Sequence, residues 1–170
     1  MNDLQLNFFA CTVSALPVFF LLYIIINVIT KRSSIIYLIG FIFTAISTEI
    51  LKKSPYESIF NLQKYGDVCY RPKGAHDCDF FSMNGLERPK IRAMPSGHMS
   101  ITTYFVVINI LILLNYKNQT IKILGIIANV ILLISMGWAR IYKLCHNKFQ
   151  VFFGTIYGTL IASFFYNCLK

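Results

Sequence analysis

The sequence predicts an all-α membrane protein, a bundle of about five transmembrane helices with its longer loops on one face. Three observations indicate this fold class. The mean hydropathy is positive, charged residues make up only 14% of the 170 residues, and the apolar residues gather in five runs. A helix needs about 20 apolar residues to cross a bilayer, so each run can form one span. The length predicts a single domain over residues 1–170.

The five apolar runs define the expected helices in chain order. They cover residues 7–30, 34–51, 99–116, 121–139 and 149–168. Pro17 lies inside the first run, where we expect it to kink the helix without ending it. The first run is longer than the apolar part of a signal peptide, which has about 7–15 residues, and Asp3 stands in place of a basic leader. We therefore expect this run to be retained as a span.

The net charge of +9 favours a membrane partner over a nucleic acid. The basic residues sit at the ends of the spans and in one loop, not along a soluble face. Lysines and arginines beside a membrane set the orientation of a chain or contact lipid headgroups. We expect the bilayer as a partner and no nucleic acid.

Two loops are expected to meet on one membrane face, because successive spans alternate in direction. The end of the second run, the start of the third, the end of the fourth and the start of the fifth share this face. It carries the long loop 52–98, the short loop 140–148 and all three histidines. An amphiphilic substrate would fit such a face, with its headgroup at the surface and its tail between helices.

Three groups of polar residues lie on this face. The first is Lys64, six intervening residues and then Arg71 with Pro72; the second is Pro95-Ser96-Gly97-His98; the third is Arg140, five intervening residues, His146 and then Gln150.

The chemistry of these groups suits phosphoryl transfer. Lys64, Arg71 and Arg140 can neutralise phosphate oxygens, the arginines in forked geometry. Ser96 and the N–H of Gly97, at the start of a helix, can add donors to an anion.

The two histidines can divide the reaction. One attacks phosphorus and the other protonates the leaving oxygen. Gln150 lies four residues after His146 and shares a helix face with it, so its amide oxygen can hold the imidazole.

Together the three groups resemble the signature of the type 2 phosphatidic acid phosphatase and haloperoxidase superfamily, K-x6-RP, PSGH and SR-x5-H-x3-D. The resemblance covers about residues 64–154 and the arrangement of spans. It implies a membrane phosphatase that hydrolyses a lipid phosphate through a phosphohistidine, without a metal or other cofactor. It also implies a role for each matching residue: His146 as nucleophile, His98 as general acid, and Lys64, Arg71, Ser96, Gly97 and Arg140 as phosphate-binding residues.

The sequence departs from this signature in three ways. Ala139 replaces the serine before Arg140, and the family often has six spans, the extra one preceding the core. Gln150 replaces the aspartate that orients the nucleophilic histidine. Dolichyldiphosphatases, a branch of the superfamily, resemble the chain here, because they carry Gln followed by Val, as in Gln150-Val151.

The resemblance at Gln150 favours a polyprenyl or dolichyl diphosphate as substrate, with phosphatidate next. Two other functions stay open: a catalytically weakened protein that binds lipid phosphates, and a lipid phosphotransferase.

Some assignments are left open by the sequence. Lys52 or Lys53, directly at the end of the second run, are alternatives to Lys64 as the phosphate lysine. Glu49 is expected to pair with one of them.

The cysteines and a histidine of the loops are less informative. Cys69 and Cys78 could form a disulfide if the site faces an oxidising compartment. Cys145 is interpreted as a spacer, and His76 as a solvated loop residue.

The orientation of the chain follows from the charges beside the first run. Asp3 precedes this run, and Lys31 and Arg32 follow it. The positive-inside rule then places residues 31–32 in the cytosol. The site would face the lumen or the extracytoplasmic side.

Overall fold

The protein is described by a computed structural model that covers residues 3–30, 34–54, 67–79, 87 and 91–168. Five long helices and one turn of 3-10 helix make up its regular structure in these residues: α1 (Asp3–Ile29), α2 (Ile35–Lys53), η2 (Asp67–Cys69), α4 (Gly97–Leu114), α5 (Gln119–Tyr142) and α6 (Lys148–Asn167). All five long helices are long and apolar enough to cross a membrane. The predicted fold class is confirmed, and each expected span matches one helix to within a few residues.

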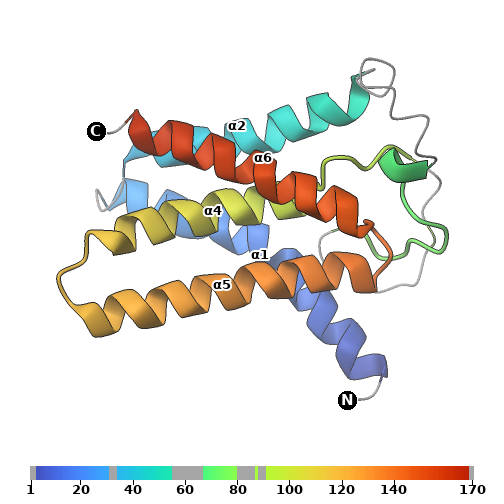
Figure 1. The fold of residues 1–170 in the computed structure, drawn as a ribbon, viewed down its shortest axis with the longest axis horizontal. Helices are drawn as coiled ribbons and strands as arrows, with labels where there is room; N and C mark the ends of the chain where they lie inside the picture. The colour runs from blue at the N-terminus through green and yellow to red at the C-terminus, as the bar shows by residue number, and fades with distance from the viewer. Residues whose placement is uncertain (1–2, 31–33, 55–66, 80–86, 88–90, 169–170) are drawn as a thin grey trace.

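Helices α2, α4, α5 and α6 run roughly along the long axis of the molecule, as Figure 1 shows. The end of α2, the start of α4, the end of α5 and the start of α6 lie at one end of the bundle, together with η2. The α4–α5 turn and the C-terminus lie at the other end. This arrangement confirms that the two polar loops share one face.

Polar residues just outside the apolar runs begin three of the helices. Ser34 Oγ accepts the N–H of Ile36 at 3.2 Å to cap α2. Asn118 Oδ1 accepts the N–H of Ile121 at 3.2 Å to cap α5. Asn147 caps α6 in a capping box with Gln150. Each cap satisfies N–H groups that have no partner inside the helix.

Helices α4 and α6 pack closely because α6 presents glycine to the backbone of α4. A Cβ atom added to Gly158 would lie 2.3 Å from the carbonyl oxygen of Ser100, and one added to Gly154 would lie 2.8 Å from that of Ser96. Glycines spaced by four residues are typical of close helix contacts in membranes. The contact holds the start of α4 against the start of α6, and both carry expected site residues.

The outward sides of the helices carry large apolar side chains. Phe19, Ile46, Ile131, Leu160 and Phe164 are each more than half exposed. An apolar surface of this extent suits hydrocarbon as the surrounding solvent. The inner sides form the core: Phe20, Ile24, Phe41, Tyr104, Ile108, Ile161 and Ala162 pack in one cluster.

Candidate active site

A cavity of about 400 Å³ opens at the polar end of the bundle. It is lined by residues from four parts of the chain: Lys52 on α2, Arg71 on the long loop, His98 on α4 and His146 on the α5–α6 turn. A larger cavity of about 610 Å³ lies between the other halves of α1, α4 and α5, where aromatic and asparagine side chains line it. The smaller cavity is the candidate site, because it holds both histidines of the predicted reaction.

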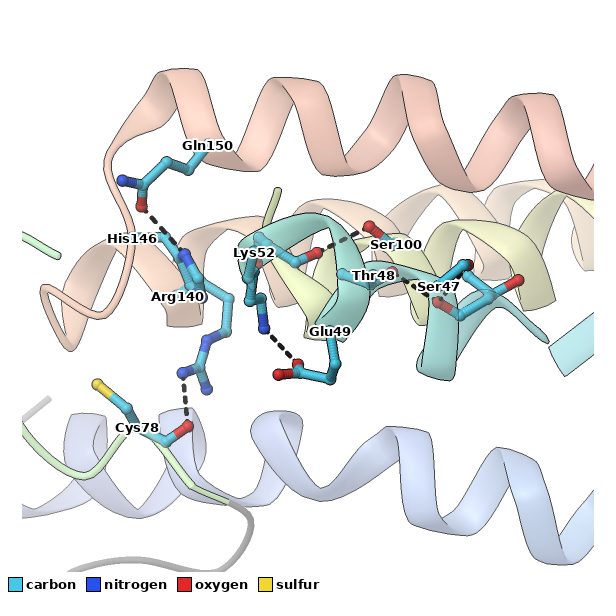
Figure 2. Close-up of polar contacts among 11 residues, drawn as sticks. Ser47, Thr48, Glu49, Lys52, Cys78, Ser100, Arg140, His146 and Gln150 are labelled. Carbon is cyan, nitrogen blue, oxygen red and sulfur yellow. Dashed lines mark hydrogen bonds and ion pairs between the residues drawn. The ribbon is translucent and has the colours of Figure 1, made fainter. Parts of the chain in front are cut away.

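The orientation of the His146 ring is set by Gln150. Oε1 of Gln150 lies 3.1 Å from Nδ1 of His146, as Figure 2 shows. Nε2 of Gln150 donates to the carbonyl oxygens of Val68 and Tyr70, each at 2.7 Å. These two acceptors require the NH₂ group on their side, so the amide oxygen faces His146. Because that oxygen only accepts, Nδ1 carries the proton and Nε2 keeps its lone pair.

His146 is kept neutral by its surroundings. Its side chain is buried, and burial lowers the pKa of His146 well below the usual 6.5. The positive charges of Arg140, Lys52 and Arg71 lower this pKa further, and the hydrogen bond to Gln150 opposes them. A neutral imidazole with a lone pair on Nε2 is the form that can attack an electrophile.

Arg140 lies behind His146 and is completely buried. Its Nη1 donates to Oγ of Ser14 at 2.9 Å and its Nη2 to the carbonyl oxygen of Cys78 at 2.8 Å. Its Nε is buried and has no hydrogen-bond partner among the described residues. The two bonds fix the guanidinium, which leaves Nε as the donor that an anion would satisfy.

Nothing in the sequence marks Ser14 as a site residue. It lies in the apolar run of α1, is completely buried and donates to the carbonyl oxygen of Ala10 at 2.7 Å. A serine in an apolar span is common, and only the three-dimensional contact with Arg140 distinguishes this one.

A disulfide joins the long loop to the α5–α6 turn. It pairs Cys78 with Cys145, so the Cys69–Cys78 pair considered from the sequence is wrong. Sγ of Cys69 lies instead 3.9 Å from Sδ of Met94. Cys145 is therefore more than a spacer, because it ties the turn that carries His146 to the loop that contacts Arg140.

The same short stretch of the long loop has two further links to the turn. Nζ of Lys143, a buried side chain, donates to the carbonyl oxygen of Asp77 at 3.2 Å. The N–H of His76 donates to the carbonyl oxygen of Lys143 at 3.3 Å. We call residues 75–78 the strap. Through the carbonyl oxygen of Cys78, the strap supplies one of the two acceptors that fix Arg140.

The start of α4 presents donors next to a positive charge. Oγ of Ser96, the residue before the helix, is buried and has no hydrogen-bond partner among the described residues. A Cβ atom on Gly97 would lie 3.2 Å from Nζ of Lys52, so this lysine sits directly beside the first turn. Helix-start N–H groups, a hydroxyl and an ammonium together suit an anion.

Lys64 is the predicted phosphate lysine, and Lys52 and Lys53 are the alternatives. Lys64 lies outside the described residues and stays a prediction. Lys52 lies in the cavity and makes an ion pair with Glu49, which confirms the pairing expected for Glu49. Lys53 is exposed.

Comparison with known proteins agrees with this geometry. The family model described as the PAP2 superfamily matches residues 33–170, a range that includes every predicted site residue. No match was found among curated proteins or among solved structures. The matched range covers α2 to α6 with the cavity between them, and the chain belongs to the PAP2 superfamily, whose members are phosphatases.

Proposed function

We propose that the chain is a membrane-embedded lipid phosphatase that works through a phosphohistidine at His146. The observation that carries this proposal is the oriented and neutral His146, with its Nε2 lone pair beside Lys52, Arg71 and His98 in one cavity. The cavity also reaches Ala45 on α2, seven residues before Lys52. That is about 10 Å deeper along the helix, at a depth where a lipid tail would lie.

The proposed reaction has two steps. Nε2 of His146 attacks phosphorus, the bond from phosphorus to the leaving oxygen breaks, and His98 gives that oxygen a proton. Water then attacks the phosphohistidine with His98 as base, which releases phosphate and restores His146. Lys52, Arg71 and the start of α4 stabilise the charge on the transferring group.

A polyprenyl or dolichyl diphosphate is the proposed substrate, with phosphatidate as the second choice. Support for this order comes from Gln150-Val151, the feature that resembles dolichyldiphosphatases. The proposed reaction uses only side chains and water, so we expect it to need no metal.

The proposed site faces the lumen or the extracytoplasmic side. The charges at Lys31 and Arg32 support this orientation through the positive-inside rule. The Cys78–Cys145 disulfide supports it independently, because disulfides persist in oxidising compartments.

A substrate panel tests the proposed function. The purified protein in detergent with EDTA should release phosphate from a polyprenyl diphosphate, and more slowly from phosphatidate. Phosphate release from neither lipid would overturn the proposal, and loss of release on adding EDTA would overturn its metal-independent chemistry.

Changing Gln150 to aspartate, the residue of the family signature, should lower activity. Aspartate cannot donate to the carbonyl oxygens of Val68 and Tyr70, and each lost bond is worth about 1 kcal/mol. We expect kcat/KM to fall by roughly 10- to 100-fold. If the protein were instead a catalytically weakened binder of lipid phosphates, this variant would gain turnover.

The pH profile gives a second measurement on the same variant. The pKa of His146 is lowered well below 6.5, so the acid limb of the wild-type kcat/KM profile should lie well below that value. A carboxylate beside the ring raises this pKa, and the acid limb should move to higher pH. Gln150→Glu is the matched variant, since it keeps the length of the side chain and exchanges the NH₂ group for a carboxylate oxygen, so it should show the same shift of the acid limb.

A further inference from the structure

Helix α1 lies outside the range that the family model matches, yet it contacts a residue of the site. The matched range begins at residue 33, whereas α1 ends at Ile29. Oγ of Ser14 on this helix accepts a hydrogen bond from Nη1 of Arg140 at 2.9 Å. Arg140 belongs to the third sequence motif, so α1 contributes directly to how one residue of the proposed reaction is held.

The hydroxyl of Ser14 is oriented so that it accepts from Arg140. Its single hydrogen goes to the carbonyl oxygen of Ala10 at 2.7 Å, which leaves its lone pairs for the guanidinium. Ser14 is completely buried, so solvent does not compete for either bond. The two bonds run in one direction, from Arg140 through Ser14 to Ala10, and bonds arranged in such a chain strengthen one another.

Packing of α1 against α5 keeps the serine in place. Ala10, one helical turn before Ser14, and Ala139 on α5 are both completely buried in one apolar cluster. Small side chains at a helix contact allow the two backbones to approach closely. Beside them, the ring of Phe9 lies 5.7 Å from the ring of Trp138. The position of the Ser14 hydroxyl is therefore set by the contact between the two helices.

The guanidinium of Arg140 is held from two different parts of the chain. Nη1 donates to Ser14 on α1, and Nη2 donates to the carbonyl oxygen of Cys78 in the strap, as Figure 2 shows for the second bond. A guanidinium is planar, so acceptors on both terminal nitrogens fix its plane. The direction of Nε is then fixed as well, and Nε is the buried donor that has no hydrogen-bond partner among the described residues. With one anchor removed, the plane could rotate.

We propose that Ser14 is a positioning residue of the phosphatase reaction, because it holds Arg140 in the orientation in which Nε donates to the transferring phosphate. This inference rests on the proposed function and deepens it. Ser14 itself does not touch the substrate and acts through Arg140. Helix α1 is thereby part of the site, although it precedes the matched range of the family.

Ser14→Ala removes the acceptor for Nη1 and leaves the rest of α1 unchanged. We expect kcat/KM for a lipid phosphate to fall by about 10-fold, the effect of one hydrogen bond to a charged group. Thr12→Ala is the matched control. Its hydroxyl makes the same kind of bond within α1, to the carbonyl oxygen of Phe8 at 2.9 Å, but Thr12 is exposed. This variant should match wild type, and a Ser14→Ala variant that also matches wild type would overturn the proposal.

A double-mutant cycle separates positioning from a general contribution to the fold. Arg140→Lys keeps the charge but loses the planar fork that Ser14 and Cys78 hold. If Ser14 acts through Arg140, adding Ser14→Ala to Arg140→Lys should lower kcat/KM by less than about 3-fold, because the two changes remove the same interaction. Equal falls in the wild-type and Arg140→Lys backgrounds would show that Ser14 only supports the fold.

Binding of inorganic phosphate separates this proposal from the proposed function. Phosphate should raise the Tm of the wild-type protein and of Thr12→Ala at the same concentration, and Ser14→Ala should need about 10-fold more. If no lipid is hydrolysed, the proposed function fails while the phosphate measurement still tests Ser14. Equal phosphate dependence in Ser14→Ala and wild type would overturn the positioning role. A Tm that does not respond to phosphate in any of the proteins would contradict the anion site and both proposals with it.

Discussion

His146→Ala should reduce phosphate release from a lipid phosphate to background, a fall of roughly 10⁴-fold or more. Removing a nucleophile eliminates the covalent route, and the remaining groups supply only charge stabilisation and binding. The cavity would keep Lys52, Arg71 and His98, so the variant should still bind inorganic phosphate. The measurement is phosphate release beside a binding assay, and turnover near the wild-type level would rule out the covalent mechanism.

His98→Ala gives the matched comparison, because loss of the general acid and loss of the nucleophile should affect activity in different ways. A general acid contributes about 10²- to 10⁴-fold, and it is needed less when the leaving oxygen is a weaker base. We therefore expect p-nitrophenyl phosphate to restore much of the activity of His98→Ala and none of that of His146→Ala. Equal recovery in both variants would mean that the assigned roles are wrong.

The fold, and the end of the bundle at which the site lies, could be predicted from the sequence because both depend on local patterns. Apolar runs of span length give the helices, and the alternation of their directions places the two polar loops together. The bond from Gln150 to His146 was expected from their spacing of four residues, and it forms although His146 lies just before the N-cap Asn147 and not on α6 itself. In each case the interacting groups are close in sequence or are constrained by the membrane.

The rest of the site depends on contacts that have no local pattern. Ser14 reaches Arg140 across 126 residues, and Cys78 pairs with Cys145 across 67. The sequence offers Cys69 as one candidate partner of Cys78, because the two cysteines bracket Arg71-Pro72. The hydrogen bonds that Gln150 donates to the carbonyl oxygens of Val68 and Tyr70 were also unpredictable. The long loop has no periodicity that would place these residues beside the start of α6.

Double replacement of Cys78 and Cys145 by alanine should lower both stability and activity. A disulfide that closes a loop of this length typically contributes about 2–4 kcal/mol to the free energy of unfolding. Activity should fall as well, because the carbonyl oxygen of Cys78 is one of the two acceptors that fix Arg140. We expect a lower Tm in detergent and a decrease in kcat/KM of roughly 10-fold, the effect of about one hydrogen bond to a charged group.

Reduction of the wild-type protein should reproduce these effects without a mutation. Cys168→Ser is the matched control, since Cys168 is an exposed cysteine outside the disulfide; it should keep wild-type activity and the same sensitivity to reductant. The double alanine variant should be insensitive. Labelling of free thiols would show that Cys78 and Cys145 are reduced. If kcat/KM were unchanged in that reduced protein, the disulfide would not be needed to position Arg140. The lysine link from Lys143 to Asp77 would then be sufficient to hold the loop, and the disulfide would serve stability alone.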